Sequence, residues 1–289
     1  MPSRRRAFNV VQASRLPVPM ASRRGAFTLV ELLVVVGIIA VLIAILMPAL
    51  AKVRKHAQEL HCAANLHSIG QALTMYVAQY RYYPGCYGFN TPNAFPAIWP
   101  TRLRAFTGGD RSVFNCPAQD ERFHWKRDGP GGPASYYAGE VEASSFGYDV
   151  GERLIAIQGS YFTYGYNVWG AGDRRDHGLR GLGAAVAATP ELLGAVRNQN
   201  PPIVAGRVKC PAEMIAIADS IPDGSWDFAI DGSVDPGSGI GIPRGWPGSI
   251  HRGGANVLFC DGHVTWYLQR DLVGYTDATR RMWHNDHEP

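Results

Sequence analysis

Residues 23–31 read Arg-Arg-Gly-Ala-Phe-Thr-Leu-Val-Glu, and an apolar run with no further ionisable side chain continues from Leu32 to Leu50. The run is nineteen residues long, close to the roughly 20 residues that an α-helix needs to cross a bilayer. A secretory signal peptide would have an apolar core of only about 7–15 residues and would place its small residues after it. Here Gly25 and Ala26 precede the run, so cleavage beside them would leave a membrane-spanning helix on the mature protein.

The order Gly-Ala-Phe-Thr-Leu-Val-Glu at residues 25–31 resembles the class III leader of type IV pilins and type II secretion pseudopilins. In that family, prepilin peptidase cuts before the Phe and methylates the new amine. The resemblance implies processing at Gly25, Ala26 and Phe27, with Ala26 where the family usually has Gly. It also implies that Glu31 pairs with the amine of Phe27 on a neighbouring subunit during assembly.

Glu31 carries the one carboxylate of this apolar segment. A charge near the centre of a helix in lipid costs at least about 2.5–3.5 kcal/mol, and such residues are usually functional. A Glu31 inside a membrane or filament therefore needs a partner. The alternative is that its side chain reaches the membrane interface.

The helical pattern continues beyond the apolar run. Apolar residues recur at spacings of three and four from Val53 to Tyr80, which is the period of an amphipathic helix. Pro48 would kink such a helix by removing one hydrogen bond, or would mark where the membrane segment ends. Because the pattern resumes directly after it, we predict one helix from Phe27 to about Tyr80.

Arginines before the apolar run favour a cytoplasmic N-terminus, although Lys52, Arg54 and Lys55 after the run weaken this bias. The resemblance to prepilin leaders implies the same orientation more firmly, with a single pass through the inner membrane. The remainder would then be periplasmic, or extracellular in a filament. We expect a prepilin leader at 1–26, a transmembrane helix segment at 27–50, an amphipathic continuation at 51–80 and a globular domain at 81–289.

Basic residues are concentrated in the leader. Six of the 28 Lys and Arg residues and none of the 24 Asp and Glu residues precede Phe27, so the rest has 22 basic and 24 acidic residues. This balance removes the electrostatic argument for a nucleic-acid partner. A translation start at Met20 would give a leader of ordinary prepilin length, whereas Met1 gives a long one, and both stay open.

Glycine and proline are frequent after the helix and predict long loops joined by short strands. Asp261-Gly262 is typical of a type I′ hairpin turn. The elements predict an α+β, pilin-like fold in which the long N-terminal helix packs on an antiparallel β-sheet. We expect strands at Met214–Ala218, Ala255–Cys260 and His263–Leu268, and a short helix at 189–196.

Further landmarks resemble pilin-like proteins of planctomycete-type bacteria that carry a C-terminal H-X9-DG region. The resemblance implies no role for that region. The landmarks are Cys62-Ala63-Ala64-Asn65-Leu66 with Gly70-Gln71-Ala72-Leu73, Phe114-Asn115-Cys116-Pro117, Tyr164-Gly165-Tyr166-Asn167, Ile217-Ala218-Asp219-Ser220, and His251 followed after nine residues by Asp261-Gly262.

Two hypotheses concern His251. In the first, Asp261-Gly262 is only a turn, and His251 hydrogen-bonds to the hairpin or caps a loop. In the second, His251, Asp261 and His263 bind Zn²⁺ or another transition ion, for which these residue types are suitable.

A separate metal hypothesis begins with Asp219 and Asp223. They open a series of aspartates in a stretch that also contains glycine and proline, and such a stretch can wrap oxygens around Ca²⁺. The spacing does not fit an EF-hand, and solvated loop aspartates are the alternative. The other members of the series are Asp227, Asp231 and Asp235.

Five cysteines would face an oxidising compartment if the body is exported, which favours one or two disulfides. Cys62 and Cys116 are the pair to test first, because a bridge between them would tie the helix to the body. The odd count leaves at least one thiol. The others are Cys86, Cys210 and Cys260.

The function predicted from these features is structural: a subunit or minor component of a type IV pilus or type II secretion pseudopilus. Its partners would be prepilin peptidase, other pilin subunits and the inner membrane. The alternative is a membrane-anchored envelope-binding protein that uses the same leader. A metallohydrolase is a third hypothesis, although the sequence lacks Gly-x-Ser-x-Gly, a phosphate-binding glycine loop and His-Glu-x-x-His, so we expect no enzyme.

Overall fold

The chain forms two compact units, Met1–Leu50 and Ala51–Pro289, which we describe separately. The computed structural model describes residues 28–88, 94–95, 97–125, 137–140, 143, 146–156, 161–168, 180–183, 203–222, 224, 227–232, 245–274 and 276–288.

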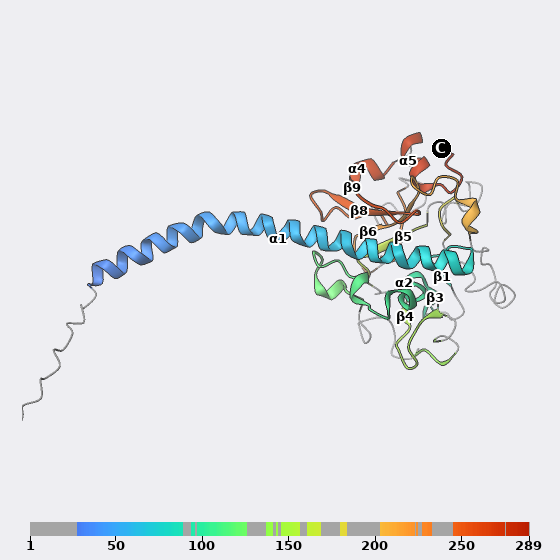
Figure 1. The fold of residues 1–289 in the computed structure, drawn as a ribbon, viewed down its shortest axis with the longest axis horizontal. Helices are drawn as coiled ribbons and strands as arrows, with labels where there is room; N and C mark the ends of the chain where they lie inside the picture. Colours follow the sequence, from blue (N-terminus) through green and yellow to red (C-terminus); the bar gives the residue numbers. More distant parts are fainter. Residues whose placement is uncertain are drawn as a thin grey trace, which may run out of the picture. The chain divides into compact units, whose positions relative to one another are not determined.

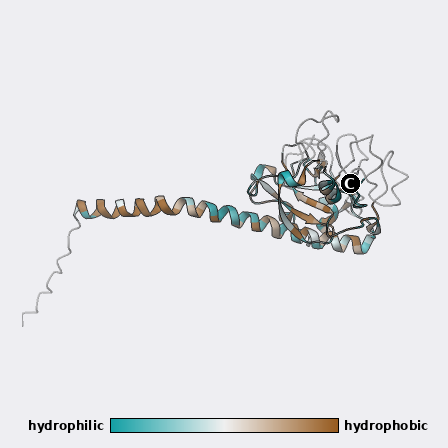
Figure 2. Ribbon diagram, turned by 90° about the horizontal axis from the view of Figure 1, so that it is seen from above, coloured by the Kyte–Doolittle hydropathy of each residue, from teal (hydrophilic) through white to brown (hydrophobic). Residues whose placement is uncertain are grey.

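Helix α1 spans Leu29–Tyr80 and continues through Pro48 (Figure 1). The predicted long helix is thus confirmed, while Phe27 lies outside the described residues. Its first half is strongly hydrophobic (Figure 2), and the residues from Thr28 to Ala57 are all exposed. Within the described part of the chain, α1 is the one helix whose length and composition would allow it to cross a membrane.

The later part of α1 packs into the unit Ala51–Pro289 along one face. Its buried apolar side chains recur every three or four residues, as expected for an amphipathic helix. The predicted face was too long, because Val53 and Leu60 are exposed. The buried positions include Cys62, Leu66, Ile69, Leu73 and Tyr76.

A five-stranded sheet forms the centre of this unit, in the order β7-β5-β6-β8-β9. β5 and β7 are parallel, and the other neighbours are antiparallel. All three predicted strands are present, with ends shifted by one residue. The strands are β5 (Tyr164–Asn167), β6 (Ile215–Asp219), β7 (Ala229–Ile230), β8 (Gly254–Phe259) and β9 (Val264–Leu268).

Successive side chains of β8 pack on opposite faces of the sheet. Leu258 joins the larger core with α1, whereas Val257 and Phe259 join a second cluster with Leu272 and Trp283. The last two come from α4 (Gln269–Leu272) and α5 (Asp277–Trp283). A sheet covered on both faces requires apolar residues at both sets of alternating positions, and β6 and β8 have them.

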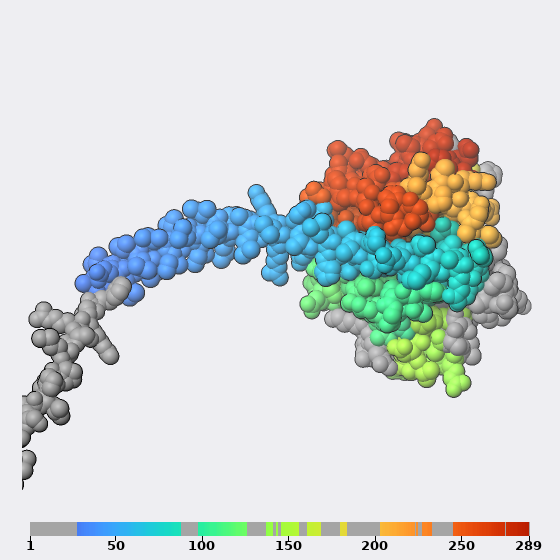
Figure 3. Space-filling model, in the orientation of Figure 1, coloured from blue at the N-terminus to red at the C-terminus, as the bar shows by residue number. Residues whose placement is uncertain are grey.

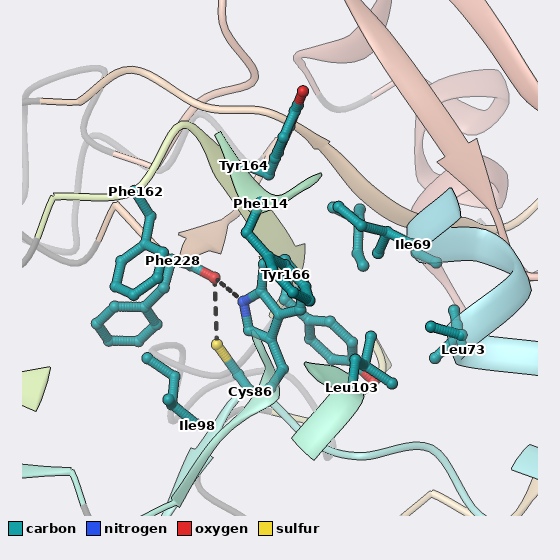
Figure 4. Packing of buried hydrophobic residues seen from close by; sticks show 14 of the residues in the cluster. Ile69, Leu73, Cys86, Ile98, Leu103, Phe114, Phe162, Tyr164, Tyr166 and Phe228 are labelled. Carbon is teal, nitrogen blue, oxygen red and sulfur yellow. Dashed lines mark hydrogen bonds between the residues drawn. The ribbon is translucent and has the colours of Figure 1, made fainter. Parts of the chain in front are cut away.

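The larger core packs α1 against the sheet, and also against loop segments that lie on the opposite side of α1. In Figure 3, the part of α1 after Ala51 (cyan) lies between the green segment that contains α2 (Trp99–Arg104) and the red C-terminal strands. Figure 4 shows Ile69 and Leu73 of α1 beside aromatic rings of β5 and neighbouring segments. Trp99 Nε1 donates a hydrogen bond to the carbonyl of Phe228 (2.8 Å), so the buried indole N–H of this core is satisfied.

The hairpin β8–β9 is confirmed, but its turn is not type I′. A type I′ turn requires positive φ at both central residues, and only Gly262 has it (+96°), not Asp261. The Gly262 N–H donates to the Phe259 carbonyl (2.9 Å), which closes a turn ending in a left-handed glycine. Gly70 of α1 lies against this turn, since a Cβ there would lie 3.1 Å from the Gly262 oxygen.

Short elements complete the described structure, and the expected helix at 189–196 lies outside it. The remaining elements are β1 (Tyr87–Gly88), β2 (Ala94–Phe95), β3 (Ala97–Ile98), η1 (Ala105–Thr107), η2 (Ser112–Phe114), η3 (Glu121–Phe123), β4 (Ile155–Ala156) and η5 (Ala205–Arg207).

Candidate functional site

Four side chains from separate elements meet in the interior of the unit Ala51–Pro289. Cys62 lies on α1, Cys116 follows η2, Asp219 ends β6 and His251 precedes β8. All four are buried, and one sulfur, nitrogen or oxygen atom from each lies within 4.8 Å of the others. We call these four residues the buried cluster.

A disulfide joins Cys62 to Cys116, the pair expected from the sequence. Backbone groups of both cysteines are held independently. The Tyr164 hydroxyl donates to the Cys62 carbonyl (3.3 Å), and the Cys116 N–H donates to the Thr163 hydroxyl oxygen (2.7 Å). Asn65, one turn after Cys62, donates its amide to the Asn115 carbonyl (2.9 Å). The disulfide therefore lies in a region where α1 and the segment after η2 are already joined.

His251 connects the disulfide to the sheet. Its Nε2 lies 3.3 Å from the Cys116 sulfur and 3.6 Å from Asp219 Oδ2. The indole N–H of Trp266 donates to the His251 carbonyl (2.7 Å), and backbone hydrogen bonds with Gly254 fix the start of β8. These contacts keep His251 in the protein interior. They do not place it at the hairpin turn, where Asp261 and His263 lie.

Asp219 is a fully buried carboxylic side chain. Its Oδ2 accepts a hydrogen bond from the Asn256 N–H (2.7 Å), whereas Oδ1 has no hydrogen-bond partner among the described residues. Burying a carboxylate is costly unless a cation, a proton or hydrogen bonds compensate it. Oδ1 of Asp219 is thus available to a further ligand, whereas the contact with the imidazole is made by Oδ2.

Arg252, next to His251, joins this loop to α1. It pairs with Glu59 through two hydrogen bonds, one of them 2.8 Å long from Nε, and its guanidinium lies 4.7 Å from the Trp266 ring centroid. Its φ of +56° is uncommon for a residue with a side chain. Because Glu59 lies one turn before Cys62, the Arg252 contacts keep the His251 loop beside the cysteines.

The hypothesis that His251, Asp261 and His263 share a transition ion is not supported by their positions. Asp261 and His263 lie together at the hairpin turn, with Oδ1 and Nδ1 2.6 Å apart, and both are largely exposed. His251 lies at the other end of the six-residue strand β8, which at about 3.4 Å per residue places it roughly 17 Å away. The three residues therefore do not form one site in the described structure, and their positions give no support to a metallohydrolase built on them.

The calcium hypothesis stays a prediction. Asp219 belongs to β6 and the buried cluster instead of a loop. Asp227 is buried and accepts hydrogen bonds from the Gly224 N–H. Asp223 and Asp235 lie outside the described residues.

Two of the other cysteines are poor nucleophiles and poor metal ligands. Burial raises the pKa of Cys86 well above its usual value, and desolvation by its surroundings likewise raises the pKa of Cys260. Both side chains therefore remain thiols at neutral pH. Cys210 is half-buried and lies outside the buried cluster.

At the start of α1, Thr28 and Glu31 form a capping box. The Thr28 N–H and hydroxyl both donate to Glu31 Oε2 (2.8 Å each), and the Glu31 N–H donates to the Thr28 hydroxyl oxygen (3.2 Å). Glu31 is exposed on an otherwise apolar surface. Gly25, Ala26 and Phe27 lie outside the described residues.

This N-terminal segment matches a known sequence motif. Residues 21–47 match the prokaryotic N-terminal methylation motif. The chain carries a prepilin-type N-terminal methylation motif. The motif supports a type IV pilin-like protein, and it points to a structural protein rather than an enzyme. No curated protein and no solved structure matches the chain significantly.

The pilin-like helix and its motif were found from the sequence, but the buried cluster was not. Its cysteines, Asp219 and His251 each belong to a separate landmark of the sequence, and no local pattern indicates that the four meet. Strand order decides this, because β6 and β8 are neighbours although about 35 residues separate them. The resemblance to proteins with an H-X9-DG region stays a prediction.

Proposed function

We propose that this chain is a structural subunit, major or minor, of a type IV pilus or a type II secretion pseudopilus. The observation that supports this most is that the methylation motif at residues 21–47 includes the start of an apolar helix whose surface is exposed in the single chain. A contiguous apolar surface of this kind requires a membrane or neighbouring subunits to cover it. The proposed location is the inner membrane, with the body periplasmic or extracellular.

Processing is the first step of the proposed function. Prepilin peptidase cleaves between Ala26 and Phe27 and methylates the new amine. Ala26 is small, as the residue before the cut has to be. The processed chain begins with a positive charge four residues before Glu31.

Assembly is the second step. In the single chain, the carboxylate of Glu31 accepts hydrogen bonds only from Thr28 among the described residues. In a filament, the amine of Phe27 on a neighbouring subunit would lie against Glu31 and compensate its charge in the apolar environment. This pairing would fix the axial position of each subunit relative to the next.

Mass spectrometry of the N-terminus of the membrane-extracted protein tests the proposal. We expect a mature chain that begins with N-methylated Phe27. The matched control is Ala26→Leu, which places a bulky residue before the cut and should leave the leader intact.

An intact leader on the wild-type chain would contradict the proposal. It would leave a permanently anchored protein and favour an envelope-binding role. Cleavage of Ala26→Leu at the same position would show that another peptidase acts on the chain, and would equally remove the argument from the motif.

A further inference from the structure

We propose that reduction of the Cys62–Cys116 disulfide converts the buried cluster into a zinc site. The ligands would be the two cysteine sulfurs, Nε2 of His251 and a carboxylate oxygen of Asp219. These four atoms already lie within 4.8 Å of one another, and all four residues are buried. Binding is independent of assembly into a filament, because every ligand belongs to the unit Ala51–Pro289.

The separations agree with tetrahedral coordination. Zinc–sulfur bonds of about 2.3 Å and zinc–nitrogen or zinc–oxygen bonds of about 2.0–2.1 Å place neighbouring ligand atoms about 3.3–3.8 Å apart. His251 Nε2 is 3.3 Å from the Cys116 sulfur and 3.6 Å from Asp219 Oδ2. The two bonded sulfurs have to move apart, and breaking their bond allows this.

A second observation points to a cation at this position. Asp219 is fully buried, and its Oδ1 has no hydrogen-bond partner among the described residues. An uncompensated carboxylate oxygen in the interior is costly, and a bound metal ion would compensate it.

The ligand set selects zinc over calcium. Thiolate is a soft ligand that favours zinc, and imidazole is also a common zinc ligand, whereas calcium takes six to eight oxygens. The site offers two sulfurs, one nitrogen and one carboxylate. Asp261 and His263, which are exposed at the hairpin turn, supply only two ligands.

The chemistry balances with a dithiol as the reductant. The dithiol gives two electrons and two protons to the disulfide and becomes a disulfide itself, while Cys62 and Cys116 become thiols. Zn²⁺ then displaces the two thiol protons, so that both sulfurs bind as thiolates. In the reverse step, the disulfide form of that dithiol takes two electrons from the thiolates and two protons from water, the Cys62–Cys116 bond forms again and the ion is released.

The ligands remain in place without the disulfide because each is held by other contacts. Tyr164 holds the Cys62 carbonyl, and Thr163 holds the Cys116 N–H. Trp266 holds the His251 carbonyl, and the Asn256 N–H holds Asp219. Reduction therefore leaves a preorganised site, which favours metal binding.

Titration of the full chain with Co²⁺ in detergent micelles tests the proposal, with Zn²⁺ as the competing ion. The protein is reduced anaerobically with a phosphine, which is removed before titration. Cobalt–thiolate charge-transfer absorption reports sulfur ligation, and circular dichroism reports folding. We expect one Co²⁺ per reduced chain, displaced by Zn²⁺, and no charge-transfer absorption from the oxidised chain.

Variants assign the ligands. Cys62→Ser/Cys116→Ser should abolish the charge-transfer absorption. His251→Ala should weaken binding by more than about 100-fold, since changes outside the ligand set alone cost about 10–100-fold. Cys210→Ser and His263→Ala are the matched controls, and both should bind as the wild type does.

Three results would overturn the site. The first is a reduced, folded wild-type chain that shows no cobalt–thiolate absorption. The second is absorption that persists in Cys62→Ser/Cys116→Ser or disappears in Cys210→Ser. If reduction unfolds the wild type, zinc should restore its folded circular dichroism, and failure to do so is the third.

Discussion

The carboxylate of Glu152 lies in the interior between two guanidinium groups. Its Oε2 is 2.8 Å from Arg104 Nη1 and 3.0 Å from Arg111 Nη2, and it also accepts a hydrogen bond from the Asp149 N–H (2.8 Å). The side chains of Glu152 and Arg104 are 0% and 5% exposed. Removing one partner of such a pair is costly because the other charge stays buried.

We predict that Glu152→Gln lowers the free energy of unfolding by about 3 kcal/mol, since it keeps the size of the side chain but leaves Arg104 without its main counter-ion. Urea unfolding followed by tryptophan fluorescence measures the change. Asp120→Asn is the control, because the exposed pair of Asp120 with Arg122 should contribute little. Equal shifts for the two variants would show that burial does not strengthen the Glu152 contacts.

Among the elements, the sequence predicted those whose patterns are local. The recurrence of apolar residues every three or four positions predicted the long helix to Tyr80. The Asp261-Gly262 pair between two apolar segments predicted the hairpin β8–β9. The turn type was wrong because the loop has three residues instead of two: the Phe259 N–H bonds to the His263 carbonyl, so a positive φ is needed at Gly262 alone. Contacts between distant segments, such as His251 with Asp219, depend on strand order and have no local signature.

The disulfide is an element-scale constraint because it closes a loop of 54 residues between α1 and the segment after η2. We predict that Cys62→Ser/Cys116→Ser, compared with the oxidised wild type without added metal, lowers the free energy of unfolding by about 4 kcal/mol. The reason is the larger conformational entropy of the unfolded chain. Urea unfolding measures the loss.

Cys210→Ser is the control for this prediction, because Cys210 has a free thiol and its replacement leaves the loop closed. It should unfold at the urea concentration of the wild type. A double variant as stable as the oxidised wild type would show that the bridge does not stabilise the fold by restricting the unfolded chain.

At the scale of the whole molecule, the two units differ in how their apolar side chains are covered. The unit Ala51–Pro289 buries its own core on both faces of the sheet. The unit Met1–Leu50 instead presents leucine, isoleucine and valine side chains to the surroundings, and its charged exception is Glu31 among the residues described there. One unit is complete as a single chain, whereas the other requires lipid or further copies of a similar helix.

The role of Glu31 in the filament can be separated from its role in the capping box. Glu31→Gln keeps an acceptor at the third helical position, which a capping box tolerates, but removes the charge. Thr28→Ala removes the box and keeps the charge. We predict that Glu31→Gln lowers incorporation into sheared filaments or pseudopili at least about tenfold, because losing a charge pair in lipid costs more than about 1.4 kcal/mol. Thr28→Ala should assemble normally.

The ratio of filament protein to membrane protein on immunoblots measures incorporation of both variants, and mass spectrometry verifies that each is processed at Phe27. Equal loss in both variants would assign the effect to the cap, and no loss in either would contradict a filament role.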